Sequence, residues 1–162
     1  MSKPPRDRAL STTSTYFVTT GSWQGTPFFQ SERVAGLLLT TLFGYRDASK
    51  FELHEFVVMP NHLHLLLSPG DELTLERAMQ LIKGGFSHRV GKDLGSRREI
   101  WQRAYVDHRI RDAADYAQHR AYIHQNPVRA HLASAASEYP YSSAHAGFQL
   151  DAAPQWLKPL AP

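Results

Sequence analysis

Hydrophobic residues recur along the chain with two different periods, which predict alternating strands and helices. Segments that alternate, or that are rich in β-branched and aromatic residues, predict strands over residues 15–20, 51–59, 62–67 and 104–106. Apolar residues spaced three and four apart predict helices over residues 31–44, 75–90 and 112–126. The order β-α-β-β-α-β-α predicts an α+β fold of the ferredoxin-like or RRM-like kind, in which two helices cover one face of a four-stranded antiparallel sheet and a C-terminal helix follows.

Capping residues and helix breakers set the expected ends of these helices. Ser31 and Asp112 each precede a helical segment, and each can accept a hydrogen bond from a backbone N–H of the first turn. Pro127 disfavours helical geometry in the residue before it, so the last helix is expected to end at Asn126. A charged loop is expected over residues 91–99. The expected domain organisation is a flexible arm over 1–13, one folded domain over 14–132, and a loosely packed C-terminal tail over 133–162 that rests on the domain.

Two counts in the composition narrow the possible chemistry. The 162 residues contain no cysteine, which excludes disulfide frameworks, thiolate zinc sites and cysteine nucleophiles. They contain nine histidines, so imidazole is the leading candidate for any metal ligand. The N-terminus is charged and proline-bearing, unlike a secretory signal, and no apolar stretch is long enough to span a membrane. We therefore expect a cytoplasmic protein with no membrane partner.

The net charge of +3 conceals an uneven distribution of charged residues. Residues 77–111 hold nine basic and three acidic side chains, and the rest of the chain is net negative. A basic segment of this kind suggests a phosphate-rich partner such as nucleic acid. A solvated helix face followed by a charged loop is the alternative interpretation of the same residues.

Two histidines in an apolar strand are the first candidates for a metal site. His62 and His64 are two residues apart, so on a strand their side chains project from one face, with Leu63 and Leu65 on the other. Two imidazoles side by side on a rigid strand can hold a metal ion. The residues around them are apolar, and a polar ring buried among apolar residues needs a polar partner or a metal ion. The alternative is that each ring only hydrogen-bonds to a neighbouring residue.

A tyrosine and an asparagine in the last predicted helix offer complementary chemistry. Tyr122 and Asn126 are four residues apart and therefore share one helix face. The carbonyl oxygen of Asn126 suits a hard cation such as Mg²⁺ or Mn²⁺, and the phenol of Tyr122 can act as a nucleophile once a metal and basic groups assist its deprotonation. Considered alone, such a tyrosine is more often a packed helix residue and such an asparagine more often a C-terminal cap.

Taken together, the two segments resemble a known family. Met59-Pro-Asn-His-Leu-His-Leu-Leu-Leu67 and the later Tyr122-Ile-His-Gln-Asn-Pro-Val-Arg-Ala130 resemble the paired motifs of the single-tyrosine HUH transposases, and most closely the branch of REP-associated tyrosine transposases. The resemblance extends over about residues 15–145. Further matching segments are residues 78–83, 100–112 and 139–143.

The resemblance implies a metal-dependent endonuclease and strand transferase that cuts single-stranded DNA near a REP-type hairpin. His62 and His64 match the two metal ligands of the HUH motif, and Tyr122 matches the nucleophile that forms a 5′-phosphotyrosine. Asn126 matches a third ligand to Mg²⁺ or Mn²⁺. Insertion-sequence relatives usually have glutamine at this position, so Gln125 and His124 stay open as alternatives to Asn126.

The same resemblance implies a single-stranded or hairpin DNA partner and indicates a monomer, with a homodimer as the alternative. Basic side chains of the 77–111 segment are candidates to contact phosphates, and an aromatic side chain is a candidate to stack on an unpaired base unless it packs in the core. These candidates are Lys83, Arg89, Arg97, Arg98, Trp101, Arg103 and Arg109. The alternative function is a non-catalytic ferredoxin-like module that binds structured DNA or RNA.

Overall fold

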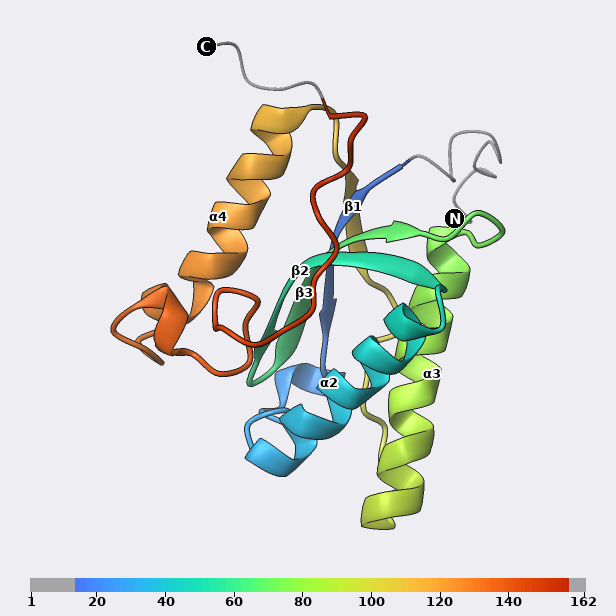
Figure 1. Ribbon diagram of the computed structural model, residues 1–162. Coiled ribbons are helices and arrows are strands. Elements are labelled where there is room, and N and C mark those ends of the chain that lie inside the picture. The colour runs from blue at the N-terminus through green and yellow to red at the C-terminus, as the bar shows by residue number, and fades with distance from the viewer. Residues whose placement is uncertain (1–13, 158–162) are drawn as a thin grey trace.

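The computed structural model describes residues 14–157, and it confirms the predicted α+β fold (Figure 1). Four strands form one antiparallel sheet in the order β2-β3-β1-β4. They are β1 (Tyr16–Gly21), β2 (Phe51–Met59), β3 (His62–Pro69) and β4 (Val106–Arg109). The described residues also form three α-helices, α2 (Glu32–Asp47), α3 (Leu75–Leu94) and α4 (Ala113–Arg129). A short 3₁₀ helix, η1 (Trp23–Gly25), precedes α2, and another, η2 (Ala136–Glu138), follows α4. The predicted N-terminal arm lies outside the described residues.

The two faces of the sheet are covered by different helices. Leu63, Leu65 and Leu67 of β3 point into the larger core cluster, which α2 and α3 close. Leu66 belongs to a second cluster on the opposite face, where α4 packs through Ile123. In Figure 1, α2 and α3 accordingly lie on one side of the sheet and α4 on the other. The side chains of His62 and His64 alternate with the core leucines and therefore face α4.

Capping explains where the helices begin, and here the sequence-based expectations hold. The side chain of Ser31 accepts a hydrogen bond from the Val34 N–H at 3.1 Å, and that of Asp112 accepts one from the Asp115 N–H at 2.8 Å. Each of these bonds satisfies a backbone donor that has no partner within its own helix. Within residues 14–157, no helix is both long and apolar enough to cross a bilayer.

α2 and β3 extend past their expected ends, to Asp47 and Pro69, and differences at α3, β4 and α4 have identifiable local causes. α3 continues through Gly91 to Leu94 and stops at Gly95, which adopts the left-handed conformation (φ 67°), so the charged loop begins later than predicted. β4 begins at Val106, because its pairing with Thr19 of β1 starts there, and the predicted segment 104–106 is mostly irregular.

The third difference concerns α4, which runs past Pro127 to Arg129. Pro127 lacks only the N–H that would bond to the carbonyl of Ile123, and its buried ring lies among residues facing the sheet. The next turn still closes, because the Ala130 N–H donates to the Asn126 carbonyl at 3.1 Å. Asn126 is therefore inside the helix and not at its end.

The C-terminal segment is bound more tightly than its composition predicts. The Val58 N–H donates to the Tyr141 carbonyl at 2.8 Å, and the Ser143 N–H donates to the Phe56 carbonyl at 2.9 Å. The phenol of Tyr139 donates to the Val58 carbonyl at 2.6 Å. Residues 139–151 thus cover the outer edge of β2, which would otherwise expose unpaired backbone groups.

Asp151→Ala is expected to loosen this segment and to lower the free energy of unfolding by about 2 kcal/mol. The Asp151 carboxylate accepts hydrogen bonds from Arg46 Nη2 at 2.9 Å, from Arg46 Nε at 3.1 Å and from the Leu53 N–H at 2.8 Å. Urea denaturation measures the change. Asp47→Ala is the matched control, because Asp47 pairs with the same arginine but is 65% exposed. Equal losses in the two variants would contradict the expectation.

Candidate metal and nucleophile site

The two histidines of β3 lie side by side under α4. Their ring centroids are 4.7 Å apart and the rings are nearly perpendicular. His64 is buried, whereas His62 is half-buried at the start of the strand. The period-two geometry of β3 thus brings both imidazoles to one face, as the spacing predicts.

Neighbouring polar side chains orient each ring. Thr19 Oγ1 lies 2.8 Å from His64 Nδ1, and Asn61 Oδ1 lies 2.7 Å from His62 Nδ1. Because Asn61 Oδ1 can only accept, His62 Nδ1 carries the proton and its Nε2 presents a lone pair. A histidine that binds a metal through one ring nitrogen usually forms a hydrogen bond through the other, which fixes the orientation of the ring.

Asn126 completes the group of donor atoms. Its side-chain amide lies 3.5 Å from His64 Nε2 and also contacts His62. A half-turn of the amide would turn its carbonyl oxygen toward the imidazoles, which would add an oxygen donor to the two nitrogen donors. Of the three candidate third ligands, Asn126 contacts the imidazoles, whereas His124 contacts Glu55 and Gln125 is exposed.

Burial keeps the two imidazoles in the form that binds metals. Burial lowers the pKa of His64 to about 3, assisted by the neighbouring His62. Burial also lowers the pKa of His62. Both rings are therefore neutral at physiological pH, and a cation entering the site does not have to displace a proton from them.

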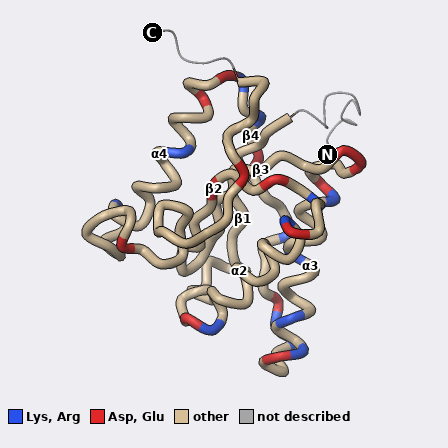
Figure 2. Tube along the Cα trace, in the orientation of Figure 1, with Lys and Arg blue, Asp and Glu red and all other residues tan. Residues whose placement is uncertain are grey.

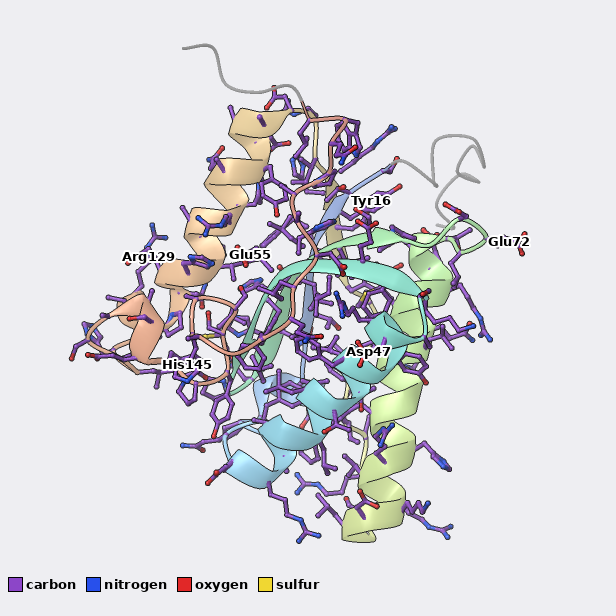
Figure 3. All side chains as sticks on the ribbon, in the orientation of Figure 1. Tyr16, Asp47, Glu55, Glu72, Arg129 and His145 are labelled. Atoms are coloured by element: carbon purple, nitrogen blue, oxygen red, sulfur yellow. The ribbon has the colours of Figure 1, made fainter. Side chains whose placement is uncertain are left out.

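Tyr122 lies beside this group and open to solvent. Its ring contacts His64 edge-on with centroids 5.3 Å apart, and the guanidinium of Arg129 lies 5.7 Å from the ring. Figure 3 shows Arg129 at the C-terminal end of α4. The side chain of Tyr122 is 39% exposed, so a macromolecular substrate can reach the phenol.

Two acidic residues that sequence reasoning did not single out hold α4 on the sheet. Buried Glu55 of β2 pairs with Arg120 Nε at 2.7 Å and with His124 Nε2 at 3.2 Å, and Figure 3 shows it beside α4. Buried Asp115 pairs with His108 Nε2 at 2.8 Å and His119 Nδ1 at 3.1 Å. The four-residue spacing of Asp115 and His119 was a local signal of this contact, whereas Glu55 had none.

The His108–Asp115–His119 cluster is a second arrangement of potential metal donors. Its three ligand atoms lie within 4.8 Å of one another. His119 Nδ1 also contacts the Asp115 backbone carbonyl at 2.8 Å, and a nitrogen that donates to a carbonyl has no lone pair for a metal. Hydrogen bonding therefore explains the contacts of His119 Nδ1, while its Nε2 keeps a lone pair. The cluster lies next to the His62–His64 pair, because the Phe17 ring contacts both His64 and His119.

Asp115→Asn is expected to lower the free energy of unfolding by about 2–3 kcal/mol at pH 7. Burial alone would raise the pKa of Asp115, but the Arg111 N–H and the His108 imidazole outweigh it and hold this pKa below the usual range. A lowered carboxyl pKa contributes stability above the unfolded value of about 3.9, and that contribution disappears as the pH falls through the folded-state pKa.

The difference between wild type and Asp115→Asn should accordingly shrink as the pH is lowered from 7 toward 3. Denaturation curves at a series of pH values test this. Asp71→Asn is the control, because Asp71 is exposed. A difference that is independent of pH would contradict the charged hydrogen-bond network.

The predicted DNA-contacting residues differ in how exposed they are. Figure 2 shows lysines and arginines spread over the trace with acidic residues between them. Five of the predicted residues are exposed, and these are Arg89, Arg97, Arg98, Arg103 and Arg109. Lys83 instead donates to the Gln102 carbonyl at 2.8 Å. Trp101 is 6% exposed and packs on Phe29 and Phe86, so its burial argues against base stacking.

Comparison with known proteins places the chain in a family. Residues 24–126 match the family model described as Transposase IS200 like. The chain is 31% identical over 140 residues to the REP-associated tyrosine transposase of Escherichia coli (strain K12), with 80% of each chain covered. A solved REP-associated tyrosine transposase bound to a REP hairpin matches with a TM-score of 0.70 at 27% identity, over 88% of this chain and 82% of that one. The chain therefore belongs to the IS200-like transposase family of enzymes, in the branch of REP-associated tyrosine transposases.

Proposed function

We propose that this protein is a metal-dependent endonuclease and strand transferase that cuts single-stranded DNA next to a REP-type hairpin. The observation that carries the proposal is the meeting of four side chains from two elements: His62 and His64 of β3 with Tyr122 and Asn126 of α4. A nucleophile beside a neutral, pre-oriented set of metal donors is what metal-assisted phosphoryl transfer requires.

His62, His64 and Asn126 would hold a divalent cation. The mixed set of two imidazoles and one amide oxygen fits Mn²⁺ and is compatible with Mg²⁺. When bound, the cation supplies positive charge against a non-bridging oxygen of the scissile phosphate. Thr19 and Asn61 keep the two imidazoles in position for that role through their Nδ1 hydrogen bonds.

Tyr122 would attack the phosphorus in line with the bond that breaks. The new bond joins the phenolic oxygen to phosphorus, the leaving oxygen takes a proton and becomes a free 3′-hydroxyl, and the DNA stays attached as a 5′-phosphotyrosine. The 3′-hydroxyl of a second strand can then displace the tyrosine and restore its phenol. No external energy source is needed, because each step exchanges one phosphoester for another.

The partner in this proposal is DNA that carries a hairpin and a single-stranded flank. Support comes from the solved relative bound to a REP hairpin, together with the exposed position of Tyr122. We propose that a monomer performs the reaction in the cytoplasm, since one chain holds the nucleophile and all three metal donors.

Incubation of the protein with an end-labelled REP-type hairpin and Mn²⁺ tests the function. The expected result is a protein–DNA adduct that resists denaturation and fails to form in EDTA. If EDTA leaves hairpin affinity unchanged and no cleavage occurs in Mn²⁺ or Mg²⁺, the protein is instead a non-catalytic binding module.

A further inference from the structure

We infer that a pocket beside His62 binds one unpaired nucleobase of the substrate strand and that Gln102 selects it. This inference rests on the proposed function, because the base belongs to the DNA that the site cuts. The pocket has a volume of about 360 Å³, within the range of small-molecule sites. His62 and Asn61 line it, so the pocket is continuous with the metal donors.

The pocket exists because side chains are missing where the strands meet. Gly21 pairs with His62 across β1 and β3, and a side chain at position 21 would project to the same face as that imidazole. Gly25 and Ala104 line the other walls. A side chain at residue 21 would meet the Gln102 amide, so the glycine leaves the space next to the imidazole to that amide.

The walls of the pocket are held in place before any ligand arrives. The Gln102 N–H donates to the Gly21 carbonyl at 2.9 Å, and Lys83 Nζ donates to the Gln102 carbonyl at 2.8 Å. The Ser22 N–H donates to the Asn61 carbonyl at 3.0 Å. A pre-formed pocket loses little conformational freedom on binding.

The backbone at the rim is strained. Gln24, next to Gly25, has a φ of 55° in the left-handed region, which costs energy for any residue with a side chain. A strained backbone conformation persists only where the surrounding contacts hold it in place, and such conformations are frequent at binding sites.

The chemistry of the lining fits a base better than a phosphate. Tyr105 and Val106 add an aromatic and an apolar surface, and Val106 is 72% exposed. Lysine and arginine are absent among the residues that line this pocket. The exposed amide of Gln102, whose Oε1 lies 3.2 Å from the position of a Cβ at residue 21, offers a donor and an acceptor side by side. Adenine is the base whose N6–N7 edge matches a glutamine amide.

A scan of abasic sites tests the inference without metal or cleavage. The probe is a REP-type hairpin with oligo-dA flanks, in which each flank nucleotide in turn is replaced by an abasic one, and affinity is measured by fluorescence anisotropy in EDTA. For wild type, we expect one flank position at which base removal weakens binding about tenfold. Gly21→Val and Gln102→Ala should bind the intact probe more weakly than wild type does. In these variants, removing the base at that position should cause no further loss of affinity.

Gly36→Val is the matched control, because a Cβ at Gly36 in α2 meets nothing within 4 Å, and this variant should retain the wild-type profile. An abasic profile that is the same in wild type, Gly21→Val and Gln102→Ala would overturn the inference while leaving the proposed function standing. Absence of hairpin binding by wild type would overturn both.

Discussion

Tyr122→Phe is expected to abolish the covalent protein–DNA adduct, with a loss of strand cleavage of about a thousandfold or more, while hairpin affinity changes less than twofold. The substitution removes one hydroxyl and keeps the ring. The edge-on contacts of that ring with His64 and Phe17 can persist, so α4 should stay in place. The lost group is the atom that would bond to phosphorus, and its loss cannot be compensated by better binding.

The measurement is a denaturing gel of labelled hairpin with Mn²⁺, and peptide mapping of the wild-type adduct locates the modified residue. Tyr116→Phe is the control on the same helix. Tyr116 is 8% exposed and burial raises its pKa to about 12, so its phenol is neither accessible nor readily ionised. A full-strength adduct in Tyr122→Phe would overturn the assignment of the nucleophile.

His64→Ala is expected to weaken Mn²⁺ binding by about a hundredfold or more, because it removes the buried donor of the His62–His64–Asn126 set. Cleavage should fall with it. Calorimetric titration of Mn²⁺ into the free protein measures the affinity without DNA, and a melting curve shows whether the variant remains folded.

His119→Ala separates the two possible metal clusters. His119 contacts the ring of Phe17, which also contacts His64, and it belongs to the His108–Asp115–His119 cluster. If the pair on β3 holds the cation, His119→Ala leaves Mn²⁺ affinity nearly unchanged. Loss of Mn²⁺ binding in His119→Ala, but not in His64→Ala, would move the site to the other cluster.

The lowered pKa values of His62 and His64 also predict how Mn²⁺ binding responds to pH. An ordinary histidine is protonated below a pH of about 6.5 and then competes poorly for metals. His64, with a pKa of about 3, stays neutral well below that value. The pH at which Mn²⁺ affinity falls should therefore lie below 6.5, and a steep loss of affinity near pH 6.5 would contradict the burial of the pair.

Much of the local structure followed from residue patterns because those patterns are short-range. Both ends of β2 were predicted to the residue. The alternating segment begins after a polar loop and stops at a turn, so each end of the strand has a local signal. Local rules misplaced the ends of α3 and α4, where Gly91 and Pro127 lie inside helices. Burial of the Pro127 ring outweighed the local preference, and propensities do not include burial.

The sequence alone determined which residues share a face: His62 with His64, through the two-residue period of a strand, and Tyr122 with Asn126, through the helical turn. Only the tertiary structure decided that α4 packs on the histidine face of β3, that Asn126 rather than His124 meets the imidazoles, and that Glu55 holds α4 there. It also left the space at Gly21 that forms the pocket. The physical reason is that face-sharing follows from backbone geometry within a few residues, whereas the packing of α4 depends on burial and ion pairs between residues distant in the chain.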